Sequence, residues 1–105
     1  MRKGYSWEYK VKTTLQKEFG KYNVIKTPFW TFLGDFIVVQ KGKLVKSVEA
    51  KSTIKDTWTP NEREKIQFEK IKEFCTEHDI PWEYWIKEGN RTRKVLYDQK
   101  TNPKL

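Results

Sequence analysis

Residues 34–51, GDFIVVQKGKLVKSVEAK, contain two apolar runs separated by Lys41-Gly42. The valine-rich composition of both runs and the glycine between them predict a β-hairpin, with strands over residues 35–40 and 43–51. Asp35 opens the first strand, and Glu49-Ala50-Lys51 closes the second. The hairpin is therefore expected to carry two carboxylates and a lysine.

The length of the hairpin turn decides whether Asp35 lies on the same face as Glu49 and Lys51. Side chains alternate between the two faces of a strand, so a regular two-residue turn at residues 41–42 places Asp35 and Glu49 on opposite faces. A three-residue turn that ends in a left-handed glycine places them on one face. A site that uses both carboxylates therefore requires an odd-length connection or a bulge.

A first helix is predicted over about residues 5–19, with Gly20 as its C-terminal stop. Its apolar stripe consists of Trp7, Val11, Leu15 and Phe19. Glu8 falls within this stripe, where a carboxylate is unfavourable unless a cation or another charged group meets it. The alternative is that Glu8 is exposed in the first turn, where it interacts favourably with the helix dipole.

A second helix follows a loop predicted at residues 52–58. In Thr59-Pro60-Asn61-Glu62, threonine is the expected N-cap, proline the first helical residue, and glutamate completes a capping box. The helix is expected to end at about His78, because Asp79-Ile80-Pro81 cannot continue it. Its inward face is predicted to carry Phe68, Ile71, Phe74 and Cys75, with Gln67 and His78 in the same arc and Ile66 outside it. We interpret Cys75 as a core residue and His78 as a helix terminator rather than a metal ligand.

Three further strands are predicted outside the hairpin. One covers residues 22–26 and ends at Thr27-Pro28, since proline cannot donate to a strand ladder. Another covers residues 82–87, with Trp85 on the face opposite its neighbours, and residues 91–97 form a possible last strand. The order of elements is then αβββαβ, possibly with a further β.

Length and composition restrict the class of protein. The 105 residues are expected to form one α/β domain, with residues 98–105 as a flexible tail. Lys and Arg number 22 against 14 Asp and Glu, a net charge of +8 that is typical of proteins that bind a polyanion, most often nucleic acid. The alternative is a basic protein without such a partner. Aromatic residues make up 15% of the chain, so large rings must supply much of the core or of an interface.

The sequence also indicates where the protein acts. Its one cysteine, Cys75, excludes a disulfide framework and a zinc cluster. It contains no apolar segment of membrane-spanning length and no signal-peptide pattern at Met1-Arg2-Lys3-Gly4. No membrane partner and a cytoplasmic location are therefore expected, for a host or a viral protein alike.

Carboxylates near a lysine suit the hydrolysis of phosphodiesters. The reaction needs a nucleophilic water and neutralisation of the charge that develops on the phosphate, and Mg²⁺ held by carboxylates assists both. Asp35 and Glu49 are the expected ligands, and Ala50 offers a backbone carbonyl. Glu49 and Lys51 leave a strand on the same face about 6–7 Å apart, so Lys51 can orient or deprotonate the water. The alternative is a plain salt bridge between Glu49 and Lys51.

The positions of these groups resemble the PD-(D/E)xK nuclease superfamily, and within it the archaeal-type Holliday junction resolvases. The resemblance covers roughly residues 2–88 and rests on three segments, namely Arg2-Lys3-Gly4-Tyr5-Ser6-Trp7-Glu8, Gly34-Asp35-Phe36-Ile37-Val38-Val39 and Val48-Glu49-Ala50-Lys51. It implies a restriction-endonuclease-like α/β domain with a mixed central sheet flanked by helices. It also implies Mg²⁺-dependent hydrolysis, with Mn²⁺ as a substitute, by a homodimer that nicks a four-way junction symmetrically.

The same resemblance implies individual roles. Glu8, Asp35 and Glu49 become metal ligands, and Lys51 becomes the catalytic lysine. Gln67 matches the position of a supporting glutamine in some relatives, and Thr31 is a candidate for the hydroxyl role of the family's Ser/Gly-rich stretch. The aromatic residues at 29–32 or 82–85 are candidates for the dimer interface.

Basic residues outside the catalytic set are candidates for DNA phosphate contacts, namely Lys3, Lys10, Lys26, Lys55, Arg63, Arg91, Arg93 and Lys94. Two alternatives to a junction resolvase remain open. One is another small nuclease of this superfamily that cuts duplex, flap or single-stranded DNA. The other is a non-catalytic, basic nucleic-acid-binding module in which Asp35, Glu49 and Lys51 form a structural charge cluster.

Overall fold

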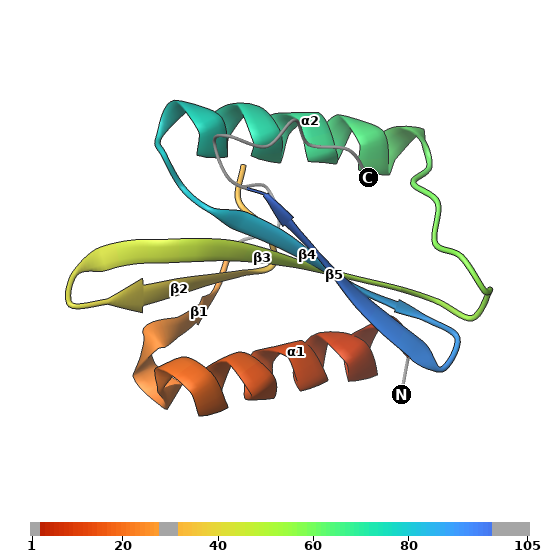
Figure 1. The fold of residues 1–105 in the computed structure, drawn as a ribbon, viewed down its shortest axis with the longest axis horizontal. Coiled ribbons are helices and arrows are strands. Elements are labelled where there is room, and N and C mark those ends of the chain that lie inside the picture. Colours follow the sequence, from red (N-terminus) through yellow and green to blue (C-terminus); the bar gives the residue numbers. More distant parts are fainter. Residues whose placement is uncertain (1–2, 28–31, 98–105) are drawn as a thin grey trace.

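The computed structural model describes residues 3–27 and 32–97 of the chain. Its elements, in chain order, are α1 (Lys3–Phe19), the 3-10 helix η1 (Lys21–Asn23), β1 (Val24–Lys26), β2 (Phe36–Gln40), β3 (Lys43–Thr53), α2 (Glu62–Glu77), β4 (Trp82–Glu88) and β5 (Arg91–Tyr97). The strands form one five-stranded sheet in sequence order, and α1 and α2 cover its opposite faces (Figure 1). The chain is thus a small α/β domain with a five-stranded mixed sheet.

The sheet is mixed because one of its connections crosses over a face. Strands β1 to β3 are paired antiparallel, as are β4 and β5, whereas β3 and β4 are parallel. Parallel neighbours need a long crossover, and α2 provides it. Within the described residues, no helix is long and apolar enough to cross a membrane.

Each helix packs on one face of the sheet and forms a core there. Between α1 and the sheet lie Trp7, Val11, Leu15, Phe36, Val38, Val48 and Trp85. Between α2 and the sheet lie Trp58, Phe68, Ile71, Cys75, Trp82, Tyr84, Ile86 and Tyr97. Strand β4 contributes to both cores, because Trp82, Tyr84 and Ile86 lie under α2 and Trp85 lies under α1.

The hairpin of β2 and β3 combines a two-residue turn with a bulge. Gln40 pairs with Lys43, and the turn residues Lys41 and Gly42 have φ angles of 51° and 77°, as a type I′ turn requires. The register then shifts, because Val38 pairs with Lys46 whereas Val39 pairs with Leu44. The extra residue is Val45. Of the two alternatives, the two-residue turn forms, and the bulge supplies the odd offset that a shared site requires.

Most predicted elements are confirmed, with shifted ends. The first helix starts two residues earlier than predicted, and Gly20 ends it with its N–H donating to Gln16 O at 2.8 Å. The possible last strand is present as β5. Strand β3 continues through Ser52 and Thr53, which pair with the end of β4, so these two residues are not part of the loop.

Two predictions at element ends are wrong. Tyr22 and Asn23 belong to η1 rather than to β1, since the Asn23 side chain donates to Phe19 O and folds the chain back after α1. The N-cap of α2 is Asn61, not Thr59. Its side chain accepts from the N–H of Glu64, whose side chain accepts from the N–H of Asn61. Two overlapping capping boxes occur in this sequence, and the one that begins with asparagine forms.

The predictions for residues 98–105 and for most of the apolar segment at 29–33 lie outside the described residues. Of that segment, Phe32 and Leu33 are described: Phe32 is exposed, and Leu33 is half-buried against the core under α2.

Candidate functional site

The bulge in the hairpin brings Asp35 and Glu49 to the same face of the sheet. Phe36 pairs with Val48, and both side chains point into the core under α1. The next residues, Asp35 and Glu49, therefore project on the opposite side, toward α2. Asp35 Oδ2 accepts a hydrogen bond of 2.9 Å from the N–H of Ala50. Asp35 and Glu49 therefore lie on one face of the sheet, as a shared site requires.

Gly34 allows the chain to reach this position. A Cβ atom at residue 34 would lie 2.6 Å from both the carbonyl carbon and the oxygen of Val48. The Gly34 N–H donates to Ser47 Oγ at 2.7 Å, and its carbonyl oxygen accepts from the Thr27 hydroxyl. Only glycine fits so close to the backbone of β3, and this close approach fixes the start of β2 and the position of Asp35.

Glu49 is held in an environment that disfavours its negative charge. Its side chain is 4% exposed. Burial, and next the nearby charge of Asp35, raise the pKa of Glu49 from 4.5 to about 8, and the neighbouring Lys51 only partly opposes this. Two adjacent carboxylates of this kind favour the binding of a proton or a cation between them.

Lys51 is anchored by α2. Its Nζ lies 3.2 Å from Glu49 Oε2 and 3.4 Å from Glu64 Oε2, and it donates to Gln67 Oε1 at 2.9 Å. Gln67 thus contacts the predicted catalytic lysine directly. Glu64 was not among the predicted site residues, although it lies one helical turn before Gln67, on the same side of the helix.

Glu8 reaches the site from α1, on the other face of the sheet. The Lys26 ammonium group contacts Glu8 Oε1 and lies 3.8 Å from Asp35 Oδ1. The two carboxylates face one cation and lie within about 8 Å of each other, because each oxygen is within salt-bridge range of the same nitrogen. Lys26, predicted as a DNA contact, is therefore part of the carboxylate network. A shallow cavity of about 230 Å³ adjoins this group and is lined by Glu8, Tyr9, Lys12, Lys26 and Phe36.

The donor chemistry of the cluster fits Mg²⁺. In the described part of the chain, no group of three or more His, Cys, Asp or Glu side chains is arranged to hold a metal ion. The carboxylates that meet here nevertheless offer oxygen, the ligand atom that Mg²⁺ requires. The group that already bridges Glu8 and Asp35 is itself a cation. The carboxylates that could contact a divalent ion are thus the pair Asp35 and Glu49, and the pair Asp35 and Glu8 if Lys26 withdrew.

The remaining predicted contact residues are spread over the surface. Lys10 and Lys94 line a cavity of about 200 Å³ between α1 and β5, where Lys94 Nζ lies 3.9 Å from the centre of the Trp85 ring. Arg93 is engaged by Glu88, at 3.0 Å from its Nε to Glu88 Oε1. The other described candidates, Lys55, Arg63 and Arg91, are exposed. The side chains of Lys3 and Thr31 lie outside the described residues.

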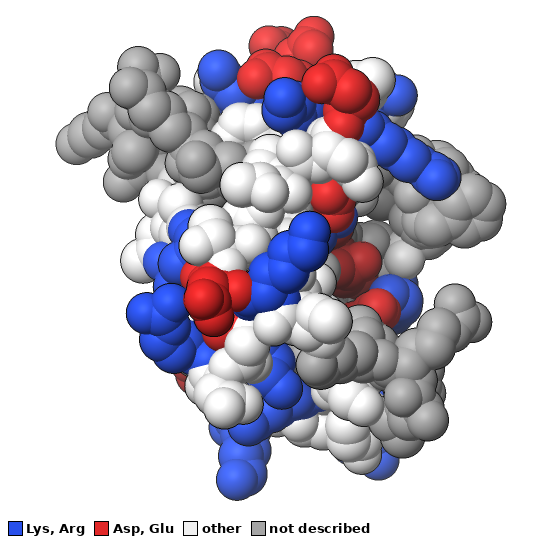
Figure 2. Space-filling view, turned by 90° about the vertical axis from the view of Figure 1, so that its right-hand side faces the viewer, with Lys and Arg blue, Asp and Glu red and all other residues white. Residues whose placement is uncertain are grey.

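The face of the molecule at this end of the sheet carries both charges. Figure 2 shows acidic side chains recessed in the right-hand half of the view and lysine and arginine side chains around them.

Cys75 and His78 have the structural roles predicted for them, as a core residue and as a helix terminator. Cys75 is a fully buried free cysteine in the core under α2, where burial raises the pKa of its thiol to about 12. His78 is the C-cap of α2, and its N–H donates to Phe74 O.

Comparisons with protein-family models, with curated proteins and with solved structures find no match to this chain. Fold and site together define a small α/β domain in which four carboxylates, two lysines and a glutamine form a network beside the start of β2.

Proposed function

We propose that the protein is a Mg²⁺-dependent endonuclease of the PD-(D/E)xK type, with a restriction-endonuclease-like fold. The observation that carries the proposal is the convergence of Asp35, Glu49 and Lys51 on one face, which the bulge at Val45 makes possible. A structural salt bridge between Glu49 and Lys51 would need neither the bulge nor the close approach of Gly34. The position of Glu8 across Lys26 from Asp35 supports a third carboxylate in the same site.

The chain's own groups have distinct tasks in this proposal. When bound, Mg²⁺ neutralises charge on the phosphate and lowers the pKa of the attacking water. Lys51 orients that water or takes its proton, and its ammonium form stabilises charge in the transition state. Gln67 and Glu64 keep Lys51 beside Glu49, because all three contacts to its Nζ come from fixed positions on α2 and β3.

The proposed substrate is a four-way DNA junction, cut by two copies of the chain. A two-fold dimer presents two identical sites at a fixed separation, which suits paired nicks in a nearly symmetric junction. The basic side chains that remain exposed, Lys10, Lys55, Arg63, Arg91 and Lys94, are proposed to contact backbone phosphates.

One observation favours the second candidate, a non-catalytic module that binds nucleic acid. Lys26 and Lys51 each contact two of the four carboxylates of the cluster, so part of the negative charge is compensated without an added cation. In that case the cluster would be structural, and the basic surface alone would bind DNA.

A nicking assay separates these candidates. A labelled four-way junction and a linear duplex of the same sequence are incubated with the protein in Mg²⁺ or in EDTA. We expect nicking of the junction in Mg²⁺ only, and we expect Glu49→Gln protein to bind the junction without nicking it. Glu73→Gln, an exposed change on α2, serves as the matched control and should keep full activity.

Each alternative has its own outcome in this assay. Equal cleavage of duplex and junction would favour a nuclease of different substrate choice. Binding of the junction by the unmodified protein without nicking, in Mg²⁺ and in Mn²⁺, would contradict catalysis and favour the non-catalytic module.

A further inference from the structure

Among the described residues, the hydroxyl group of Tyr84 is a buried polar atom without a hydrogen-bond partner. Tyr84 lies on β4 and is fully buried, and its hydroxyl has no hydrogen-bond partner among the described residues. Leaving such a group without a partner is unfavourable, because it loses its hydrogen bonds to water on burial. Phenylalanine would fill the same space without this penalty, so packing alone does not account for a tyrosine here.

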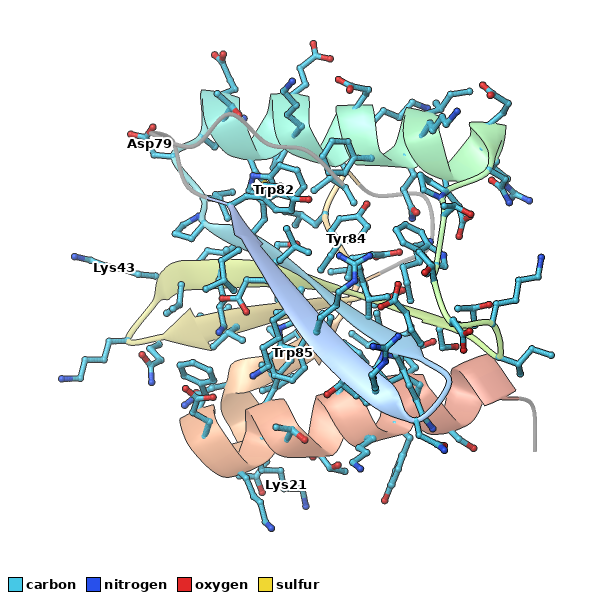
Figure 3. All side chains as sticks on the ribbon, turned by 45° about the vertical axis from the view of Figure 1, so that its right-hand side comes forward. Lys21, Lys43, Asp79, Trp82, Tyr84 and Trp85 are labelled. Carbon is cyan, nitrogen blue, oxygen red and sulfur yellow. The ribbon has the colours of Figure 1, made fainter. Side chains whose placement is uncertain are left out.

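The surroundings of the ring are aromatic. Trp58, Phe68, Trp82 and Tyr97 surround it, with ring centres 5.7–6.3 Å from that of Tyr84. Figure 3 shows Tyr84 between the sheet and α2, on the side opposite Trp85. These rings pack around the phenol, and none of them provides a hydrogen-bond partner for its hydroxyl.

The hydroxyl is close to the carboxylate site. Tyr84 is the register partner of Glu49 on the parallel strand β3, so the two side chains leave the sheet side by side on the face that α2 covers. Neighbouring strands are about 4.8 Å apart, within reach of a hydrogen bond between side chains or of one bridging water. Burial raises the pKa of the Tyr84 hydroxyl, and the negative charge of Glu49 is the next cause, which places that carboxylate near the hydroxyl.

We propose that Tyr84 is a positioning residue of the carboxylate site, whose hydroxyl donates a hydrogen bond, directly or through one water, to the Glu49 carboxylate when that carboxylate holds a divalent cation. The inference rests on the proposed function, since the cation is the one that the nuclease needs. Partners of this kind fix the orientation of a ligand, and their loss lowers metal affinity by about 10–100-fold. The unsatisfied hydroxyl thus has a partner only in the cation-bound state.

The test compares Tyr84→Phe with the unmodified protein and with Tyr97→Phe. Tyr97 is a matched control because it is buried in the same aromatic cluster, with its ring centre 4.0 Å from that of Trp82. Mn²⁺ binding is followed by the loss of the electron paramagnetic resonance signal of free Mn²⁺. Urea unfolding in EDTA measures the stability of the metal-free protein.

We expect Tyr84→Phe to bind Mn²⁺ at least tenfold more weakly, with an unchanged or higher urea midpoint, and Tyr97→Phe to keep the unmodified affinity. Unchanged Mn²⁺ affinity in Tyr84→Phe, with binding still lost in Glu49→Gln, would overturn this inference and leave the proposed function intact. A lower midpoint for metal-free Tyr84→Phe would also overturn it, because the hydroxyl would then have a partner in the metal-free fold. Absence of Mn²⁺ binding to the unmodified protein would overturn both proposals.

Discussion

Replacing Glu49 by glutamine should make the protein more stable at neutral pH. The reason is the raised pKa of the buried Glu49 carboxyl, about 8 in the folded protein against 4.5 for the free group, which arises first from burial and then from the charge of Asp35. The folded state therefore binds this proton more tightly than the unfolded state does. Stability is complete below about pH 4.5 and falls as the pH rises toward 8.

The magnitude follows from the same shift. Each pH unit between the two pKa values removes about 1.4 kcal/mol of folding free energy, so the unmodified protein loses about 3 kcal/mol from this group between pH 5 and pH 7.5. Glutamine carries no charge, can donate to Asp35 and can accept from Lys51. The free energy of unfolding of Glu49→Gln should gain about 3 kcal/mol relative to the unmodified protein over this range.

Urea unfolding measured between pH 5 and pH 8 in EDTA tests this prediction. Tryptophan fluorescence reports the transition, because Trp7, Trp58, Trp82 and Trp85 are buried in the folded protein. Glu73→Gln, the exposed control, should run parallel to the unmodified protein. If the curves of Glu49→Gln and of the unmodified protein are also parallel, Glu49 does not carry the raised pKa and the reasoning is refuted.

Three further changes test other parts of the structure. Asn61→Ala should lower the free energy of unfolding by about 1 kcal/mol, because it removes the N-cap of α2, while Thr59→Ala should change it by less than half as much; equal effects in urea unfolding would contradict the observed cap. Gly34→Ala should destabilise the protein by roughly 1–3 kcal/mol and weaken Mn²⁺ binding, because its Cβ would clash with the Val48 carbonyl group; a stability unchanged in thermal unfolding would mean that the backbone of β3 yields easily. Lys26→Met removes the cation that bridges Glu8 and Asp35, so Mg²⁺ should raise the melting temperature of the variant more than that of the unmodified protein; an equal rise would show that Lys26 does not compete with the ion.

The periodic elements were predictable because their signals are local. The apolar stripe of α1 and the valine-rich strands of the hairpin follow directly from side-chain periods of 3.6 and 2. Where the local signal is ambiguous, the prediction failed. The sequence before α2 contains two possible capping boxes, one that begins at Thr59 and one that begins at Asn61. Neither motif by itself predicts that Asn61 is the N-cap.

The sequence showed which hairpin register a shared site of Asp35 and Glu49 requires, but it did not predict which register forms. The signal of the observed register is the pair Leu44-Val45, two consecutive apolar residues that break the alternation of β3 at the bulge. The strand predicted over residues 43–51 contained this pair without a bulge. The position of a bulge depends on which residues of the two strands pair. Here the pairing depends on the burial of Val38 in the core under α1, which is a tertiary contact.

The network around the carboxylates depends still more on tertiary structure. Lys26 and Glu8 are 18 positions apart, and nothing between them predicts their contact. It follows from two long-range facts, the pairing of β1 with β2 and the packing of α1 across the sheet. The position of Tyr84 beside Glu49 likewise needs the parallel pairing of β3 with β4.

Two energetically unfavourable features, the buried Glu49 carboxyl and the Tyr84 hydroxyl, unpartnered within the described part of the chain, help to decide whether the carboxylate cluster is structural or functional. A charge cluster that serves only the fold is expected to have its polar groups satisfied within the fold. Here Glu49 is buried beside Asp35, and the Tyr84 hydroxyl next to it has no partner among the described residues. Both features are unfavourable in the metal-free protein, and both would be relieved by one divalent cation. Because they meet at the point where Gly34 and the bulge direct Asp35 onto Glu49, they favour a cation-binding site over a structural salt bridge.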